Sequence, residues 1–321
     1  MADVAADYRE FGEVYARGVS PLYEELSYGV AADSDLLALL SELPPGKRQP
    51  NLLYAAARFA FGVASDFAEF RRGVLDRRDA VVATMLARRT QTNEPARCAS
   101  LYPLLARLPQ PVALLEVGAS AGLCLQPDRY RYDYDGVPAG DPDSPLLLRC
   151  RVAGSPPPGT AGELSVAWRA GIDLNPLDIT DPDDVRWLET LIWPGPGHDE
   201  RAGRLRAAVE IARRDPPRVV PGDLNDLLPA LADEAPSGAT LVVCHTAAIA
   251  YLSGVDRRRF IDVVRGLPGR WISQEAPTVI SSVAGHLRGE PPHPAMFAMA
   301  FDGEPVAYTA PHGGVIHWLS R

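Results

Sequence analysis

The residues with the clearest capacity for chemistry stand at the end of an apolar run near the middle of the chain. Residues 112–117 are apolar except for one acid, and glycine, serine and glycine follow at alternate positions. The residues concerned are Glu116, Gly118, Ser120 and Gly122. Glycine has no Cβ and tolerates positive φ, so a strand that ends in such a turn lets a ligand approach the backbone closely. The pattern predicts a buried parallel strand followed by a ligand-binding turn.

The spacing Glu-x-Gly-x-Ser-x-Gly resembles motif I of class I S-adenosylmethionine-dependent methyltransferases, with Ser120 in place of the usual middle glycine. The resemblance implies that S-adenosylmethionine is the cofactor. Gly118, Ser120 and Gly122 would then hold it, and the carboxylate of Glu116 would meet a sugar hydroxyl or the ammonium group of the ligand.

The same residues also satisfy Gly-x-Ser-x-Gly, the nucleophile elbow of α/β-hydrolases. A serine hydrolase would use Ser120 as nucleophile and His245 or His312 as base. However, the upstream residues predict helices rather than most of a sheet, and Pro127 would interrupt the helix that follows an elbow. This chemistry therefore stands as an alternative.

Composition places the chain among ordinary globular proteins. Of its 321 residues, 46% are hydrophobic and 23% are charged, which suits one large domain with a smaller one. A net charge of −9 argues against binding bulk nucleic acid, because phosphates need a basic surface. The longest uncharged apolar run, residues 239–252, is shorter than the roughly 20 residues that span a bilayer. Since the first residues lack signal-peptide features, we expect a cytoplasmic protein with no membrane partner.

The spacing of cysteine and histidine predicts neither a disulfide framework nor a metal site. The four cysteines are scattered and form no Cys-x-x-Cys pair. The pairs His286 with His293 and His312 with His317 do not have diagnostic ligand spacings. We expect no bound metal.

Hydrophobic periodicity predicts two domains. Residues 1–108 combine helical patterns with capping residues, which predicts a helical N-terminal domain that ends near the prolines around position 110. In residues 109–321, apolar runs alternate with helical patterns, which predicts βαβ units and a mostly parallel sheet. The predicted strands are 112–117, 164–173, 218–221, 240–244 and 270–273, followed by an antiparallel hairpin over 295–301, 305–308 and 315–319. The predicted fold class is α/β, of the Rossmann-like methyltransferase type.

In an open parallel sheet, ligands bind beyond the carboxyl ends of the strands, so the residues there are site candidates. Asp173 ends the second predicted strand and can take both ribose hydroxyls. Asp223 and Leu224 follow the third, at the position that resembles the adenine contact of methyltransferases. His245 follows the fourth as a candidate general base, and Glu275 follows the fifth, where it would orient His245 or hold an acceptor amine. A histidine hydrogen-bonded in a polar cleft and a solvated glutamate are the plainer alternatives.

A long insertion separates the first two predicted strands. Within residues 126–163, Tyr130, Tyr132 and Tyr134 alternate with polar residues, so their rings would share one face of a strand. We expect a hairpin whose tyrosines, Tyr130 and Tyr132 among them, either line a substrate pocket or pack on the domain.

Two sequence blocks carry a second resemblance. Residues 91–94, Gln-Thr-Asn-Glu, with Arg97, and residues 114–123 together resemble a family of uncharacterised bacterial proteins known only as a domain of unknown function. The resemblance spans nearly the whole chain and implies a class I methyltransferase-like fold without an established reaction. Gln91, Thr92 and Asn93 are predicted to contact a ligand or to cap the helix that follows.

The leading prediction is an S-adenosylmethionine-dependent methyltransferase that acts on a small or medium-sized acceptor. Methyl transfer needs alignment of the acceptor with the sulfonium more than a nucleophilic side chain, so the sequence does not identify the acceptor. The alternatives are a serine hydrolase and a non-catalytic Rossmann-like protein with a binding or regulatory role. The sequence predicts no particular oligomeric state.

Overall fold

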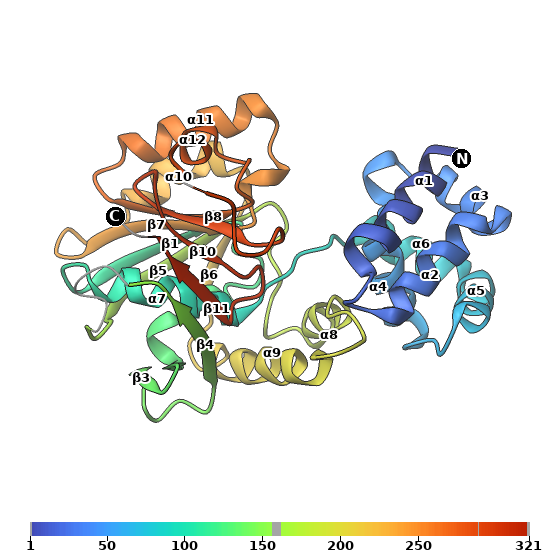
Figure 1. Cartoon of the computed structure of the whole chain (residues 1–321), viewed down its shortest axis with the longest axis horizontal. Coiled ribbons are helices and arrows are strands. Elements are labelled where there is room, and N and C mark those ends of the chain that lie inside the picture. The colour runs from blue at the N-terminus through green and yellow to red at the C-terminus, as the bar shows by residue number, and fades with distance from the viewer. Residues whose placement is uncertain (1, 156–161, 288, 320–321) are drawn as a thin grey trace. The chain divides into compact units, whose positions relative to one another are not determined.

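The structure is a computed structural model, and it describes residues 2–155, 162–287 and 289–319 (Figure 1). Within these limits the chain divides into two compact units. The helical unit comprises Met1–Thr92 and Asp181–Gly203, and the sheet unit comprises Asn93–Thr180 and Arg204–Arg321. The mixed α/β character and the helical N-terminal region that the sequence predicts are both present.

The compact units divide the chain at other positions than the predicted boundary after residue 108. Helix α7 (Cys98–Ala106) belongs to the sheet unit and is buried along its whole length. The Ala99 carbonyl accepts a hydrogen bond from the Tyr134 hydroxyl at 2.8 Å, and the Ser100 hydroxyl bonds Gln274 at 3.0 Å. The last helix before the first parallel strand is thus packed with the sheet.

Several helices of the helical unit begin at a polar residue whose side chain caps the helix. The Ser20 hydroxyl accepts a hydrogen bond from the Tyr23 amide, and the Asp33 carboxylate accepts bonds from two amides of the next helix. The elements are α1 (Ala2–Glu10), a π-helical turn (Phe11–Ala16), α2 (Pro21–Ala32), α3 (Ser34–Glu42), a 3-10 turn η2 (Pro45–Lys47), α4 (Pro50–Phe61), α5 (Phe67–Asp76), α6 (Arg78–Ala87) and α8 (Pro182–Thr190). Helix α9 (His198–Ala212) starts in this unit and ends in the sheet unit.

The sheet unit contains one large sheet in which most neighbouring strands are parallel. Its strand order is β3-β2-β4-β11-β10-β9-β8-β7-β1-β5-β6. The strands are β1 (Val112–Val117), β2 (Arg131–Tyr134), β3 (Val137–Gly140), β4 (Leu147–Ala153), β5 (Val166–Asp173), β6 (Arg218–Pro221), β7 (Thr240–Thr246), β8 (Arg270–Glu275), β9 (Phe297–Phe301), β10 (Glu304–Thr309) and β11 (Val315–Trp318). The five predicted parallel strands and the terminal antiparallel segment are therefore found.

The order of the strands reverses at β1. The chain passes from β1 to β5 and β6 on one side, and then returns to place β7 and β8 on the other side. Both neighbours of β1 are parallel to it, with Glu116 opposite Gly171 of β5 and Cys244 of β7. The carboxyl ends of β5, β1 and β7 consequently lie at one edge, where an open α/β sheet binds ligands.

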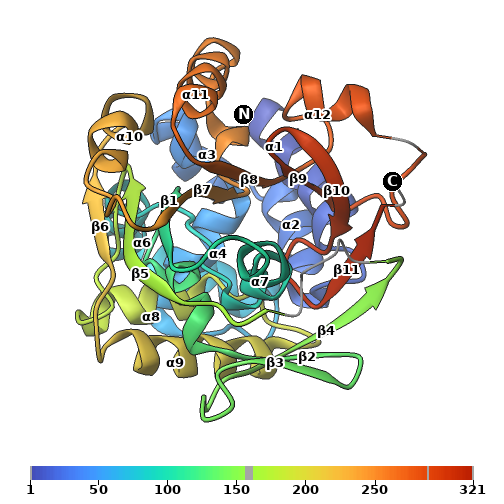
Figure 2. The same ribbon diagram turned by 90° about the vertical axis from the view of Figure 1, so that its left-hand side faces the viewer.

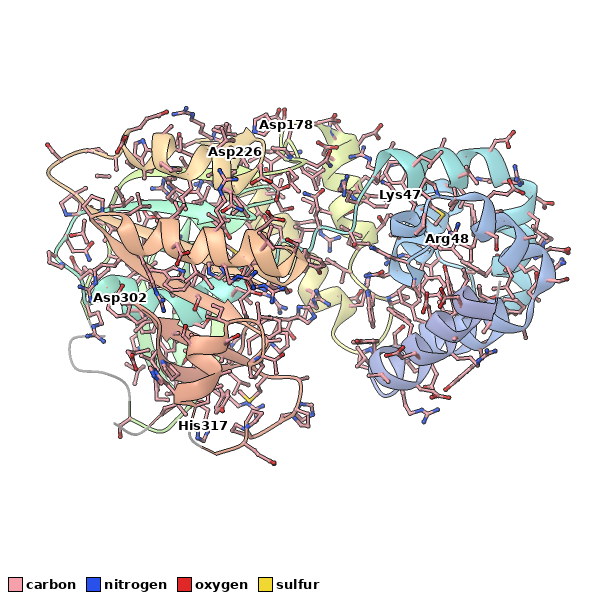
Figure 3. All side chains as sticks on the ribbon, turned by 90° about the horizontal axis from the view of Figure 1, so that it is seen from above. Lys47, Arg48, Asp178, Asp226, Asp302 and His317 are labelled. Atoms are coloured by element: carbon pink, nitrogen blue, oxygen red, sulfur yellow. The ribbon has the colours of Figure 1, made fainter. Side chains whose placement is uncertain are left out.

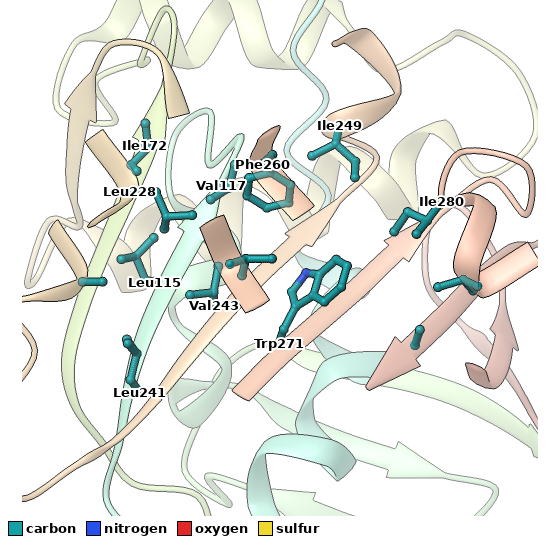
Figure 4. Packing of buried hydrophobic residues seen from close by; sticks show 14 of the residues in the cluster. Leu115, Val117, Ile172, Leu228, Leu241, Val243, Ile249, Phe260, Trp271 and Ile280 are labelled. Carbon is teal, nitrogen blue, oxygen red and sulfur yellow. The ribbon is translucent and has the colours of Figure 1, made fainter. Parts of the chain in front are cut away.

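Helices cover both faces of the parallel part of the sheet. Helices α10 (Leu224–Ala232), α11 (Gly254–Gly266) and α12 (Ser281–His286) lie on one face, and α7 lies on the other (Figure 2). Alternate residues of the strands, such as Leu115, Val243 and Trp271, pack with Leu228 and Phe260 of the helices (Figure 4). Burial on both faces explains why these strands are nearly continuous apolar runs.

The predicted insertion is a hairpin that also extends the sheet. Strand β2 pairs antiparallel with β3 and parallel with β4, and β4 pairs with β11. Long-range pairing of this kind leaves no local signal in the sequence. Residues 156–161 of the predicted insertion lie outside the described residues.

Two of the polar residues labelled in Figure 3, Lys47 and Asp302, hydrogen-bond to backbone groups that are distant in the sequence. Lys47, the single lysine, donates from Nζ to the Arg88 carbonyl at 2.7 Å within the helical unit. Asp302, in the predicted turn between β9 and β10, accepts a hydrogen bond from the Trp271 amide at 2.8 Å. In the part of the chain that the structure describes, no helix has the length and apolar character needed to cross a bilayer.

We expect Leu228→Ala to lower the free energy of unfolding of the sheet unit by about 2–5 kcal/mol, because Leu228 is fully buried between α10 and the sheet. Val255→Ala on α11 is the control, since Val255 is 67% exposed and its truncation should cost less than about 0.5 kcal/mol. Urea unfolding followed by tryptophan fluorescence measures both. Equal losses in the two variants would show that this cluster does not hold the sheet unit together.

Candidate functional site

A tight loop follows β1 at the point where the strand order reverses. Gly118, Ser120 and Gly122 all have positive φ, at 74°, 53° and 72°. A Cβ on Gly118 would lie 2.5 Å from the Cβ of Ala248, in the loop that follows β7. The loop conformation and the closeness of the neighbouring loop both require glycine at position 118.

The backbone amides of the glycine loop are used inside the protein. Gly118 and Ala119 both donate to the Ile172 carbonyl, at 2.8 and 3.1 Å, and Gly122 donates to the Ala119 carbonyl at 2.7 Å. The chain continues into two 3-10 turns, η4 (Leu123–Leu125) and η5 (Pro127–Arg129), rather than into an α-helix. This differs from the phosphate cradle of dinucleotide-binding turns, in which free amides and a helix N-terminus meet the anion.

Two polar side chains anchor this loop. Asp173, at the end of β5, accepts hydrogen bonds from the amides of Ser120 and Asn175, each at 2.8 Å. Asn93 accepts a hydrogen bond from the Leu123 amide at 2.9 Å. The structure therefore brings Asp173 and Asn93 to the glycine loop, as the site prediction requires, but it gives the Asp173 carboxylate a part in shaping the loop.

Glu116 is the most unusual residue of the site. Its side chain is 2% exposed, and its Oε2 atom has no hydrogen-bond partner among the described residues. Burial raises the pKa of Glu116 well above its usual value; the charges of Cys124 and Asp173 act in the same direction and Arg97 acts against them. An unsatisfied buried carboxyl is costly, so its presence at the strand-order reversal marks a place where a ligand group can supply the missing partner.

Arg97 lies beside Glu116 and was not among the predicted site residues. Its guanidinium donates to the carbonyl and hydroxyl of Thr246, at 3.1 and 3.3 Å, and to the Pro311 carbonyl at 2.9 Å. Thr246 lies two residues beyond Cys244, which is paired with Glu116, so Arg97 reaches the carboxyl end of β7 on the same face of the sheet as Glu116. The sequence signal was available, since Arg97 belongs to one of the two blocks that resemble a known family.

Other polar residues that the sequence analysis did not predict make buried contacts around Arg97 and the loop. Ser100 on α7 bonds Gln274 of β8 at 3.0 Å, and Gln274 donates to the Thr309 hydroxyl at 2.7 Å. Glu94 pairs with Arg204 at 3.0 Å with its side chain only 3% exposed. These contacts join segments that are far apart in sequence, which is why no local motif indicated them.

His245 and Glu275 form a buried pair on the opposite face of the sheet from Glu116. The Nδ1 atom of His245 lies 2.7 Å from Oε1 of Glu275, and a carboxylate oxygen only accepts, so Nδ1 is the donor. Burial disfavours the Glu275 carboxylate, but its bonds to His245 and to the amides of Ala248 and Ile249 hold the pKa of Glu275 below its usual value. The imidazole is 0% exposed and packs between Phe260 and Trp271.

The His245 ring is 0% exposed and its Nε2 atom has no hydrogen-bond partner among the described residues, so the expectation that it meets an acceptor stays a prediction. The expectation that Glu275 orients His245 agrees with the contact between them. The plainer alternative of a solvated Glu275 is wrong, since its side chain is buried.

Ser120 has no catalytic partner in the described part of the chain. Its Oγ atom is buried and makes no hydrogen bond there, so neither His245 nor His312 contacts it. The serine, histidine and acid that the hydrolase alternative requires therefore do not form a hydrogen-bonded triad among the described residues.

Four further predicted site residues make structural contacts. Asp223 is exposed and accepts a hydrogen bond from the Asn225 amide at 2.8 Å as the N-cap of α10, and Leu224 packs against the hydrophobic cluster. Tyr130 and Tyr132 are completely buried, and their hydroxyls donate to the carbonyls of Leu123 and Pro127. Amphipathic tyrosines bury their rings once the hydroxyl finds a partner, so these two are packing residues and not pocket residues.

The block at residues 91–94 is divided between the two units. Gln91 and Thr92 belong to the helical unit, and Asn93 and Glu94 belong to the sheet unit. The predicted capping role falls to the next residue along, because Glu94 accepts a hydrogen bond from the Ala96 amide at the start of the 3-10 turn η3 (Pro95–Arg97).

The cysteines near the site are buried thiols. Cys98, Cys124 and Cys244 are each at most 1% exposed, and burial raises the pKa of Cys98 and Cys244 well above the usual range. Within residues 2–155, 162–287 and 289–319, no group of three or more His, Cys, Asp or Glu side chains is arranged to hold a metal ion.

Fold and site together define an α/β protein with a glycine-containing loop at the carboxyl edge of a mostly parallel sheet. The chain belongs to the family described as "Uncharacterized protein conserved in bacteria (DUF2332)", whose model matches residues 5–318. The resemblance to a bacterial family of unknown function that the two sequence blocks indicate is confirmed. No curated protein matches the chain.

The raised pKa of Glu116 predicts a pH-dependent effect on stability. The unfolded chain releases this proton near pH 4.3 and the folded protein releases it at higher pH, so ionisation destabilises the fold as pH rises through that interval. Because glutamine cannot ionise, the Glu116→Gln variant should gain up to about 1.4 kcal/mol per pH unit relative to the wild type above about pH 4.3. Urea unfolding at several pH values measures the difference, and a difference that stays constant with pH would contradict the raised pKa.

Proposed function

We propose that this protein binds S-adenosylmethionine at the carboxyl edge of its sheet and acts as a methyltransferase on a small or medium-sized acceptor. The observation that carries the proposal is the buried, unpartnered Oε2 of Glu116 beside the glycine loop, at the reversal of strand order. A carboxyl group in this state is suited to receive a ligand ammonium, which would supply both the hydrogen bond and the opposite charge that burial has removed.

The topology supports a nucleoside ligand at this edge. Numbered by their order in the chain, the five parallel strands β6-β5-β1-β7-β8 are arranged 3-2-1-4-5, as in doubly wound nucleotide-binding sheets. The neighbouring β9 is antiparallel to β8, which suits the Rossmann-like methyltransferase arrangement that the sequence suggests.

The hydrogen bonds of the glycine loop favour a ligand without a phosphate at this position. A dinucleotide would need amides directed at its pyrophosphate, whereas Gly118, Ala119 and Gly122 donate to backbone carbonyls. S-adenosylmethionine carries a sulfonium, an amino-acid end and a nucleoside, and it makes no such demand.

The residues present fit the chemical groups of this cofactor. Glu116 would hold the ammonium, and Arg97 would place a guanidinium near the carboxylate of the same amino-acid end. Asp173, fixed beside the loop, would offer oxygen lone pairs to the ribose hydroxyls. When bound, S-adenosylmethionine supplies an activated methyl group, and the protein's part is to bind and orient both reactants.

Isothermal titration with S-adenosylmethionine and S-adenosylhomocysteine tests the proposal. We expect a dissociation constant of roughly micromolar order for the wild type. Binding should be lost in Gly118→Val, because valine is strained at φ 74° and would meet Ala248, and it should weaken at least about tenfold in Asp173→Ala. Asp226→Ala is the control, because it removes an exposed carboxylate of α10, and this variant should bind the ligand like the wild type.

Absence of binding by the wild type would overturn the methyltransferase proposal and favour a non-catalytic binding or regulatory role. Covalent labelling by a fluorophosphonate that disappears in Ser120→Ala would favour the serine hydrolase alternative instead.

A second titration isolates the amino-acid end of the ligand. Methylthioadenosine has the nucleoside and sulfur but lacks the ammonium and carboxylate, so its affinity should be unchanged in Glu116→Gln. The same variant should bind S-adenosylhomocysteine more weakly by about 1.5–3 kcal/mol, the usual worth of a hydrogen bond to a charged group. Equal losses for the two ligands would show that Glu116 does not contact the ammonium.

A further inference from the structure

The segment that follows β7, residues 247–252, is held by two side chains of opposite charge. Oε1 of Glu275 accepts hydrogen bonds from the amides of Ala248 and Ile249, at 2.9 and 3.0 Å. Arg257 of α11 donates to the carbonyls of Ile249, Ala250 and Leu252, at 3.0, 3.1 and 3.1 Å. Glu275 thus binds the amides of the segment and Arg257 binds its carbonyls.

This use of Arg257 is specific to one residue of the basic run 257–259. Arg257 also donates to the Val279 carbonyl at 3.2 Å, so its guanidinium makes backbone bonds to two separate segments. Its neighbour Arg259 is exposed and pairs only with Asp226, at 3.0 Å, among the contacts described. Arg259 therefore lies on a solvated face of α11, whereas Arg257 bonds the backbone.

The clamped segment stands directly against the glycine loop. Ala247 has φ of 54° and donates to the Gln274 carbonyl, and Ala248 lies where a Cβ on Gly118 would approach to 2.5 Å. Positive φ at a residue with a side chain is unfavourable and persists only where the surroundings enforce it. The bonds from Glu275 to Ala248 and Ile249 hold the backbone directly after Ala247.

The buried pair is hydrogen-bonded to this segment. His245 is 0% exposed, and its single described hydrogen bond, at 2.7 Å, goes to the same Glu275 oxygen that receives the two amides. His245 therefore fixes Glu275, and Glu275 fixes Ala248 against Gly118.

We propose that residues 247–252 form a preorganised wall of the ligand site and that His245, Glu275 and Arg257 are its positioning residues. The inference deepens the proposed function and rests on it for the identity of the ligand. In this proposal His245 supports the wall and does not transfer a proton. The wall limits how far the loops after β1 and β7 can separate.

Amide hydrogen exchange and S-adenosylhomocysteine affinity test the proposal on the full chain. In Glu275→Ala and Arg257→Met, exchange at residues 248–252 should accelerate at least about tenfold and the ligand affinity should fall about tenfold, because the backbone bonds are lost. Arg259→Met is the matched control and should change neither quantity. Exchange in β1 and β5 reports whether each variant keeps its sheet.

His245→Asn separates support from chemistry, since the asparagine amide can donate to Glu275 as Nδ1 does but cannot act as a base. We expect His245→Asn to keep wild-type exchange and affinity and His245→Ala to lose both. Unchanged exchange in Glu275→Ala, or faster exchange without loss of affinity, would contradict the proposal that residues 247–252 form a wall of the ligand site. A wild type that binds no S-adenosylhomocysteine would overturn the proposed function, while the exchange of residues 248–252 would still decide whether the clamp exists.

Discussion

The parallel pairing of β1 with β5 on one side and β7 on the other is the constraint on which the rest of the sheet unit depends. It places the glycine loop, Asp173 and the segment after β7 at one edge, although Asp173 lies 55 positions beyond Gly118 and the segment begins 74 positions beyond Asp173. Because β1 is buried on both faces, a one-residue slip would move Glu116 into the apolar cluster that contains Leu115 and Val117. The candidate site is a consequence of that pairing.

Buried polar groups near this edge fall into two kinds. Arg97 and the Oε1 atom of Glu275 each make several hydrogen bonds and fix the backbone around them, whereas Oε2 of Glu275 has no partner in the described chain. Glu116 lies among them with an oxygen that has no partner in the described chain, and its burial is a net cost to the fold. The place of this oxygen, at the reversal of strand order beside the glycine loop, is what supports the proposed function.

The residues that sequence analysis assigned to the site fall into two groups: those that local patterns identify and those that local patterns leave ambiguous. Glu116, Gly118 and Asp173 were found because a strand, a turn and an acid are encoded locally and the sheet rule places them together. Tyr130 and Tyr132 were ambiguous, because an alternating aromatic pattern fits a pocket wall and a packed hairpin equally well. Their buried rings became evident only when the carbonyls of Leu123 and Pro127 were seen to accept their hydroxyl protons.

By itself the sequence determined the parallel strands, most of the helices, the terminal antiparallel segment and the family, since periodicity, capping residues and local motifs are properties of short stretches. Tertiary structure alone decided that β4 pairs with β11, that α7 packs with the sheet, and that His245 packs between Phe260 and Trp271. The physical reason is that burial and hydrogen-bond partners depend on which distant segments meet. No residue carries that information in its own neighbourhood.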